Sequence, residues 1–210
     1  MPRSLVPRLL VAAAATFLVI GVSGCAPAGG GAAQSSVPTI PTIPYAPTTT
    51  KTSAAAGSED FRHLLLAPAD LSDAEDTFNE RSKDSQPNGN PGASAFFVND
   101  EDNRAVSDTF LVYPDAATAT ATLKQAAATL PTLVAGGSPT PLAVGTDGVV
   151  ISGSIPDEDK AVTLVFFTEG RALVRLEFQS AAGDPTTDQF VTNVAKMQQI
   201  ALRVGLSDTQ

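Results

Sequence analysis

The stretch VTLVFFTEGRALVRLEFQ, from Val162 to Gln179, decides the predicted fold. Its first part, Val162 to Phe167, is apolar at nearly every position, which is typical of a central strand that is covered on both faces. Glu169-Gly170 has the composition of a tight two-residue turn. From Val174 to Gln179, apolar and polar residues alternate, as they do in a strand with one buried face. The stretch therefore predicts two neighbouring antiparallel strands, the first of them central in its sheet.

Three more strands are predicted upstream of this hairpin, over Ala95–Asn99, Val106–Tyr113 and Val149–Ile155. The polar run Asp100 to Asn103 separates the first two and predicts a hairpin turn. By contrast, Arg81 to Gly92 is rich in Pro, Gly and Asn, so its composition predicts a loop.

Helical spacing occurs in three places. The first is a short helix around Phe61, Leu64 and Leu65, with Pro68 either ending it or opening another helix at Asp70-Leu71. The second begins at Pro114-Asp115 and is expected to stop before Pro131. The third is expected to have Asp184 as its N-cap, Pro185 at its first position and Gly205 at its end. Its predicted apolar stripe consists of Phe190, Val194, Met197, Ala201 and Val204.

These elements predict one α+β domain over residues 58–206, an antiparallel sheet of about five strands packed by helices. It follows two segments of different character. Residues 1–24 are expected to be a signal peptide, and residues 25–57 a lipidated cysteine followed by a disordered linker.

The leader carries two arginines and no acid between Met1 and Arg8, followed by a largely apolar, uncharged run from Leu9 to Val22. The run is shorter than the roughly 20 residues that a membrane-spanning helix needs. It predicts the apolar region of a secretory signal peptide, and the alternative is an uncleaved membrane anchor.

Val22-Ser23-Gly24-Cys25 directly follows this run and resembles the lipobox of bacterial lipoproteins. The resemblance implies cleavage before Cys25, an S-diacylglycerol thioether on its sulfur and an N-linked acyl group such as palmitate. Two or more acyl chains hold a protein stably at a membrane. Cys25 is also the only cysteine, so the chain has no intramolecular disulfide. We therefore expect the lipid on Cys25 to anchor the protein to the extracytoplasmic side of the cell membrane.

The linker after Cys25 has one charged residue, Lys51, up to Gly57 and is dominated by Ala, Gly, Pro, Ser and Thr. Its repeat Pro38 to Pro44 favours extended polyproline II, and a fully extended linker would reach on the order of 100 Å. The threonines among the prolines leave two interpretations open, an O-glycosylated stalk and a plain spacer. The threonines are Thr39, Thr42, Thr48, Thr49, Thr50 and Thr52.

Net charge limits the partners. The full chain carries −9, and without Arg3 and Arg8 of the leader it holds 11 basic and 22 acidic residues, a net of −11. Such a surface repels phosphate backbones and anionic headgroups, so we expect no nucleic-acid partner and no anchoring by a basic patch.

Signatures of catalysis are missing from the sequence. His63, the only histidine, adjoins Leu64-Leu65-Leu66 and is expected on the surface of a helix or partly buried. No Gly-x-Ser-x-Gly and no phosphate-loop or dinucleotide-binding glycine pattern occurs. With one histidine and a lipidated cysteine, a zinc site is not expected. We expect no catalytic residue, no metal and no cofactor.

Two acidic runs, Asp100-Glu101-Asp102 and Asp157-Glu158-Asp159, offer oxygen ligands of the kind that Ca²⁺ prefers. Neither run has EF-hand spacing, and both fall where hairpin turns are expected. Solvated turn residues are therefore the favoured interpretation, and calcium binding is the alternative.

Taken together, the mature chain resembles small actinobacterial, especially mycobacterial, lipoproteins. The resemblance rests on the lipobox, the Pro/Thr/Ala linker, Leu64 to Leu71 (LLLAPADL) and Val112-Tyr113-Pro114-Asp115 before a helix. The Leu-Leu-x-x-Pro-Ala-Asp/Glu-Leu opening is also similar to that of extracellular sensor-like domains of mycobacterial receptor kinases. This implies a sensor-like role at the cell envelope.

Three functions follow as hypotheses. The first is a non-catalytic binding or protein-interaction module for an unknown protein or apolar ligand, in which Phe96, Phe97, Phe166 and Phe167 either line a cleft or pack in the core. The second is a lipid or glycolipid carrier, which needs a large apolar cavity. The third is a hydrolase that uses carboxylates alone.

Overall fold

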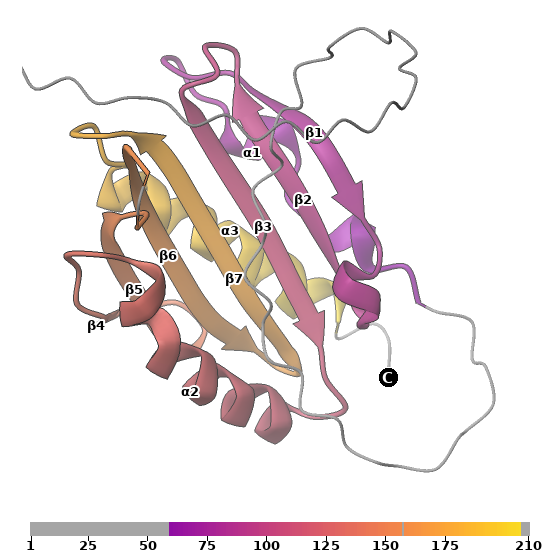
Figure 1. Cartoon of the computed structure of the whole chain (residues 1–210). Helices are drawn as coiled ribbons and strands as arrows, with labels where there is room; N and C mark the ends of the chain where they lie inside the picture. Colours follow the sequence, from indigo (N-terminus) through magenta and orange to yellow (C-terminus); the bar gives the residue numbers. More distant parts are fainter. Residues whose placement is uncertain (1–58, 157, 207–210) are drawn as a thin grey trace, which may run out of the picture. The chain divides into compact units, whose positions relative to one another are not determined.

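The computed structural model describes residues 59–156 and 158–206 (Figure 1). The predicted signal peptide, the lipobox with Cys25 and the linker to Gly57 lie outside these residues. The elements are, in chain order, η1 (Phe61–Leu64), α1 (Pro68–Leu71), β1 (Phe78–Asp84), η2 (Pro87–Gly89), β2 (Gly92–Asn99), β3 (Arg104–Val112), α2 (Ala116–Leu133), β4 (Thr140–Pro141), β5 (Thr146–Ser154), β6 (Lys160–Glu169), β7 (Ala172–Ala181) and α3 (Asp188–Gly205).

One sheet holds all of these strands in the order β1-β2-β3-β7-β6-β5-β4, and every neighbouring pair is antiparallel. The predictions of an α+β fold and an antiparallel sheet are confirmed. The predicted number of strands is wrong, because the sheet has seven strands where the sequence indicated about five.

The two missed strands lie at the edges of the sheet. In β1 only Phe78 is buried and the following residues are exposed, so the strand has no apolar alternation to reveal it. It overlaps the predicted loop from Arg81 and is held by its backbone pairing to β2. The other, β4, has only two residues, both exposed, and pairs with Val149 and Val150 of β5.

The predicted central hairpin is β6 and β7, which pair over their whole length from Lys160↔Ala181 to Glu169↔Ala172. Gly170 in their turn has a φ of +55°, a conformation that glycine adopts without strain. β7 pairs with β3 on its other side, so β7 is the middle strand of the seven.

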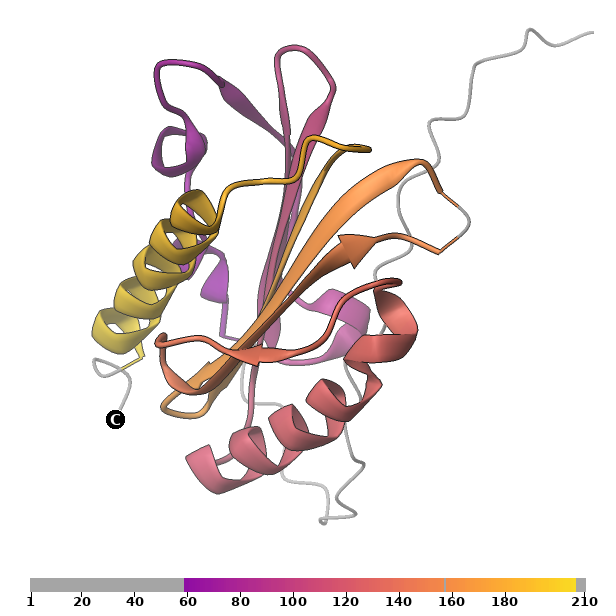
Figure 2. The same cartoon turned by 90° about the vertical axis from the view of Figure 1, so that its left-hand side faces the viewer.

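Helices cover both faces of the sheet, and Figure 2 shows α3 and α2 on opposite sides. The core beneath α3 also contains η1 and α1, and its largest fully buried members are Phe97, Phe110, Phe167 and Phe178. The core beneath α2 contains Leu123, Leu130, Ile151, Leu164 and Phe166. Of the two interpretations of the phenylalanines, packing in the core is confirmed for Phe97, Phe166 and Phe167. Phe96 is only partly buried.

Helix α2 does not stop before Pro131, as predicted, but continues to Leu133. Pro131 lacks an N–H and removes one helical hydrogen bond, yet it is exposed in the last turn. The turn persists because Leu130 and Val134 on either side are buried, and the Val134 N–H donates to the Leu130 carbonyl at 3.1 Å.

Helix α3 begins later than predicted, at Asp188. Its N-cap is Thr187, whose hydroxyl accepts the Phe190 N–H at 3.3 Å, and Asp184 does not cap it. The predicted stripe is correct for Val194, which is buried, and for Phe190 and Met197, which pack partly buried against the same core. It is wrong for Val204, which is 61% exposed, while its neighbour Leu202 is buried. Gly205 is the last residue of the helix, as predicted, and a Cβ at this position would lie 2.0 Å from the Leu64 side chain.

Candidate functional site

A small cleft lies where the loop before β1, the start of β3 and the start of α3 meet. Asp73 organises the loop, because one of its carboxylate oxygens accepts the Glu75 and Asp76 N–H groups at 2.8 and 2.9 Å. These hydrogen bonds lower the pKa of Asp73 and keep it ionised. The cleft has a volume of about 100 Å³, which is below the 300–1,000 Å³ usual for small-molecule sites.

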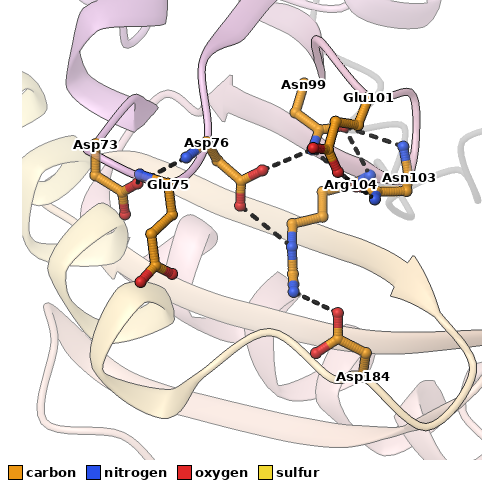
Figure 3. A network of polar contacts seen from close by, with 8 residues as sticks. All are labelled: Asp73, Glu75, Asp76, Asn99, Glu101, Asn103, Arg104 and Asp184. Carbon is orange, nitrogen blue, oxygen red and sulfur yellow. Dashed lines mark hydrogen bonds and ion pairs between the residues drawn. The ribbon is translucent and has the colours of Figure 1, made fainter.

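Arg104 is the centre of the polar network in this cleft (Figure 3). Its guanidinium forms ion pairs with Asp76, at 3.2 Å, and with Asp184. Asn99 completes the network: its amide donates to Asp76 and Asn103 at 2.7 and 2.8 Å, and its oxygen accepts the Arg104 backbone N–H at 3.0 Å. The charges of the cleft are thus largely satisfied among themselves. We conclude that the network ties three loops together.

A larger groove of about 360 Å³ lies between the start of α3 and the β4–β5 ribbon. We call it the hydroxyl groove. It is lined by Ser138, Thr140, Leu142, Val150, Ser152, Asp188, Val191 and Thr192.

Chemically, the hydroxyl groove combines an apolar patch with hydrogen-bonding groups. Val191 is buried, and Leu142 and Val150 pack against the same core. Ser152 is exposed, and its oxygen accepts the Thr163 hydroxyl at 2.9 Å, which leaves its own hydrogen available to a ligand. Asp188 adds one carboxylate acceptor. The groove can therefore hold a small molecule that offers both an apolar face and hydroxyl groups.

A third polar feature lies on the α2 side of β7. Arg175 is 2% exposed and pairs with Glu177, whose other oxygen accepts the Gln179 amide at 2.6 Å. Burial lowers the pKa of the Arg175 guanidinium, and Glu177 opposes this effect. The Nε of Arg175 and the hydroxyl of Thr109 beside it have no hydrogen-bond partner. This buried ion pair is part of the packing between β7 and the sheet face beneath α2.

Among the described residues, those that the sequence singled out as candidates do not line the cleft or the hydroxyl groove. Val22, Ser23, Gly24 and Cys25 lie outside the described residues. His63 is exposed on η1, with its Nδ1 2.9 Å from the Asp60 carbonyl, as expected for a surface position.

The first acidic run forms the β2–β3 turn, as predicted. Asp100 accepts the Asn79 amide at 2.7 Å, and Glu101 accepts the Asn103 amide at 3.0 Å. In the second run, Asp157 lies outside the described residues. Over residues 59–156 and 158–206, no three His, Cys, Asp or Glu side chains gather as metal ligands. Within the same ranges, no helix is long and apolar enough to cross a membrane.

Comparison with known proteins finds a likeness to a solved structure and none to a family model or a curated sequence. Among solved structures, the extracellular domain of PknH from Mycobacterium tuberculosis is similar, with 13% identity and a TM-score of 0.48. The match covers 70% of this chain and 96% of that domain. This is a distant structural resemblance. It agrees with the expected likeness to extracellular domains of mycobacterial receptor kinases at that coarse level, and the lipoprotein class stays a prediction.

Proposed function

We propose that this chain is a non-catalytic binding module of the cell envelope, held at the membrane by the lipid on Cys25, and that the hydroxyl groove is its ligand site. The observation that carries the proposal is the groove itself. Its volume falls in the range of small-molecule sites, and its lining mixes hydroxyl groups with apolar side chains.

The ligand class follows from that lining. Four hydroxyl side chains and one carboxylate surround the apolar patch of Leu142, Val150 and Val191. An anionic ligand would meet Asp188 and an acidic protein, so a neutral molecule fits better. A sugar offers hydroxyl groups on its rim and C–H groups on its faces. We therefore assign the groove to a small neutral saccharide or a molecule of that chemistry.

Filling the groove is the test of this assignment. Neutral mono- and disaccharides titrated into the protein at millimolar concentration are expected to shift the NMR amide signals of Thr140, Ser152 and Thr192. Val150→Phe places a ring in the groove and should reduce these shifts at least tenfold. Ala128→Phe, on the exposed side of α2, is the matched control and should leave them unchanged. Shifts that persist in Val150→Phe, or no shifts with any sugar of the panel, would contradict the assignment.

The anchor is tested separately by fractionation. In its native host, the wild-type protein is expected in the membrane fraction and Cys25→Ala in the soluble or secreted fraction, because only the thiol can carry the thioether. Ser35→Ala in the linker should fractionate like the wild type. A Cys25→Ala protein that stays with the membranes would show that another segment holds it there.

A further inference from the structure

A carboxyl group lies inside the core beneath α3. Asp108 on β3 is 0% exposed and lies on the same face as Val106 and Phe110. One of its oxygens accepts the Leu66 backbone N–H at 3.3 Å, and the other has no hydrogen-bond partner. Burial raises the pKa of Asp108 to about 7, although the Leu66 N–H and the charge of Lys83 oppose the shift.

The segment that supplies this N–H, Phe61 to Leu71, closes the same core. Five of its side chains are buried, namely Phe61, Leu64, Leu65, Leu66 and Leu71. It is also tied to α3, since the buried Gln198 amide donates to the Leu64 carbonyl at 3.1 Å. Asp108 and Gln198 therefore hold the segment from two sides, the sheet and the helix.

We propose that the segment Phe61–Leu71 is a pH-sensitive clasp, docked firmly while Asp108 is protonated and opened more often once Asp108 ionises. A neutral carboxyl is tolerated in an apolar core, but a carboxylate there needs several donors or water. Asp108 has one donor, Leu66. Because Leu66 belongs to the segment itself, undocking the segment is the direct route by which water reaches the charge.

The groups around Asp108 provide little further stabilisation for an ionised carboxylate. Its partners across the sheet are Ala95 on β2 and Leu176 on β7, both apolar. Lys83 on β1 is the charged group that acts on Asp108, and its ammonium is already paired with Glu80 at 3.0 Å. α3 contributes the uncharged Gln198.

The charged side chains of the segment itself point away from the core. Arg62, His63 and Asp70 are exposed, and Arg62 is paired with Asp60. None of them neutralises Asp108. The ionisation of Asp108 is therefore coupled to the docking of this segment.

The direction of the pH effect follows from proton linkage. The docked state keeps a proton that the open state releases between about pH 4 and 7, so protonation stabilises docking at low pH and this contribution is lost as pH rises to about 7. One proton changes the opening equilibrium tenfold per pH unit. From pH 5 to pH 7 the open population should rise about fiftyfold, and it should level off above pH 7 as Asp108 ionises in the docked state as well.

Hydrogen exchange of the Leu66 amide measures this opening. After correction for the intrinsic rate, its protection is expected to fall about fiftyfold from pH 5 to pH 7 and to be lower than that of Leu176 in the middle strand. Asp108→Asn is isosteric with the neutral carboxyl and keeps the acceptor, so its profile should be flat. His63→Gln controls for the histidine of the segment and should keep the wild-type profile.

Three results would overturn the clasp: a flat wild-type profile, a pH dependence that survives Asp108→Asn, or Leu66 protection equal to that of Leu176. If Asp108→Asn does not fold, the carboxyl carbon of Asp108 in the wild-type protein is followed by NMR. A midpoint near 7 supports the proposal, and a midpoint near 4 contradicts it.

Discussion

The Phe178→Ala variant is expected to lose about 3–5 kcal/mol of unfolding free energy. Phe178 is 1% exposed on the middle strand and is one of the largest fully buried side chains. Its ring meets Phe190 of α3 edge to face, with the ring centres 6.1 Å apart. Truncation therefore removes buried apolar surface and leaves a cavity at the contact between the sheet and α3.

Urea unfolding with thermal melts measures the loss, and the melting temperature should fall by roughly 10 °C. Val204→Ala is the matched control, since Val204 is 61% exposed on the same helix that Phe178 supports. It should change the unfolding free energy by less than about 0.5 kcal/mol. If the two variants were equally stable, the core beneath α3 would be packed differently from the structure.

The second large effect is expected from Glu177→Ala, at about 3 kcal/mol. The change leaves Arg175, whose side chain is 2% exposed, without its ion-pair partner. Removing one member of a buried pair typically costs 3–5 kcal/mol, because the other charge stays buried without compensation. The lower value is appropriate since Glu177 is itself 13% exposed.

A double variant separates the ion pair from general damage to β7. Arg175→Met with Glu177→Leu removes both charges and keeps the volume, so its stability should return to within about 1 kcal/mol of the wild type. Chemical denaturation of the single and double variants gives the comparison. A Glu177→Ala protein as stable as the wild type would mean that water reaches the guanidinium.

Much of the fold is predictable because five strands carry a clear apolar pattern. The predictions over Ala95–Asn99, Val106–Tyr113, Val149–Ile155 and the Val162–Gln179 hairpin correspond to β2, β3, β5, β6 and β7. The pattern fails at β1, where one side chain is buried and the rest of the strand is joined to the sheet mainly by its backbone pairing to β2. Burial of alternate residues is what the sequence encodes, and an edge strand does not require it.

The hydroxyl groove was not predictable, since it joins Thr140 and Ser152 to Thr192, which lies far along the chain on another element. Serine and threonine have no periodicity of their own, and the contact depends on where α3 begins. Asp108 did leave a signal. It occupies an inward position between Val106 and Phe110, and an acid in an apolar alternation indicates a buried carboxyl.

The strand order has a consequence for how the chain folds. β1–β2–β3 and β5–β6–β7 are two meanders of sequential strands, and only the β3–β7 pairing joins them. The helix that follows the first meander, α2, packs on β5, β6 and β7 of the second. The β3 edge of the first meander stays unpaired until β7 of the second meander pairs with it. We therefore expect local hairpins to form early, the docking of the two halves to limit the folding rate, and the domain to unfold as one cooperative unit.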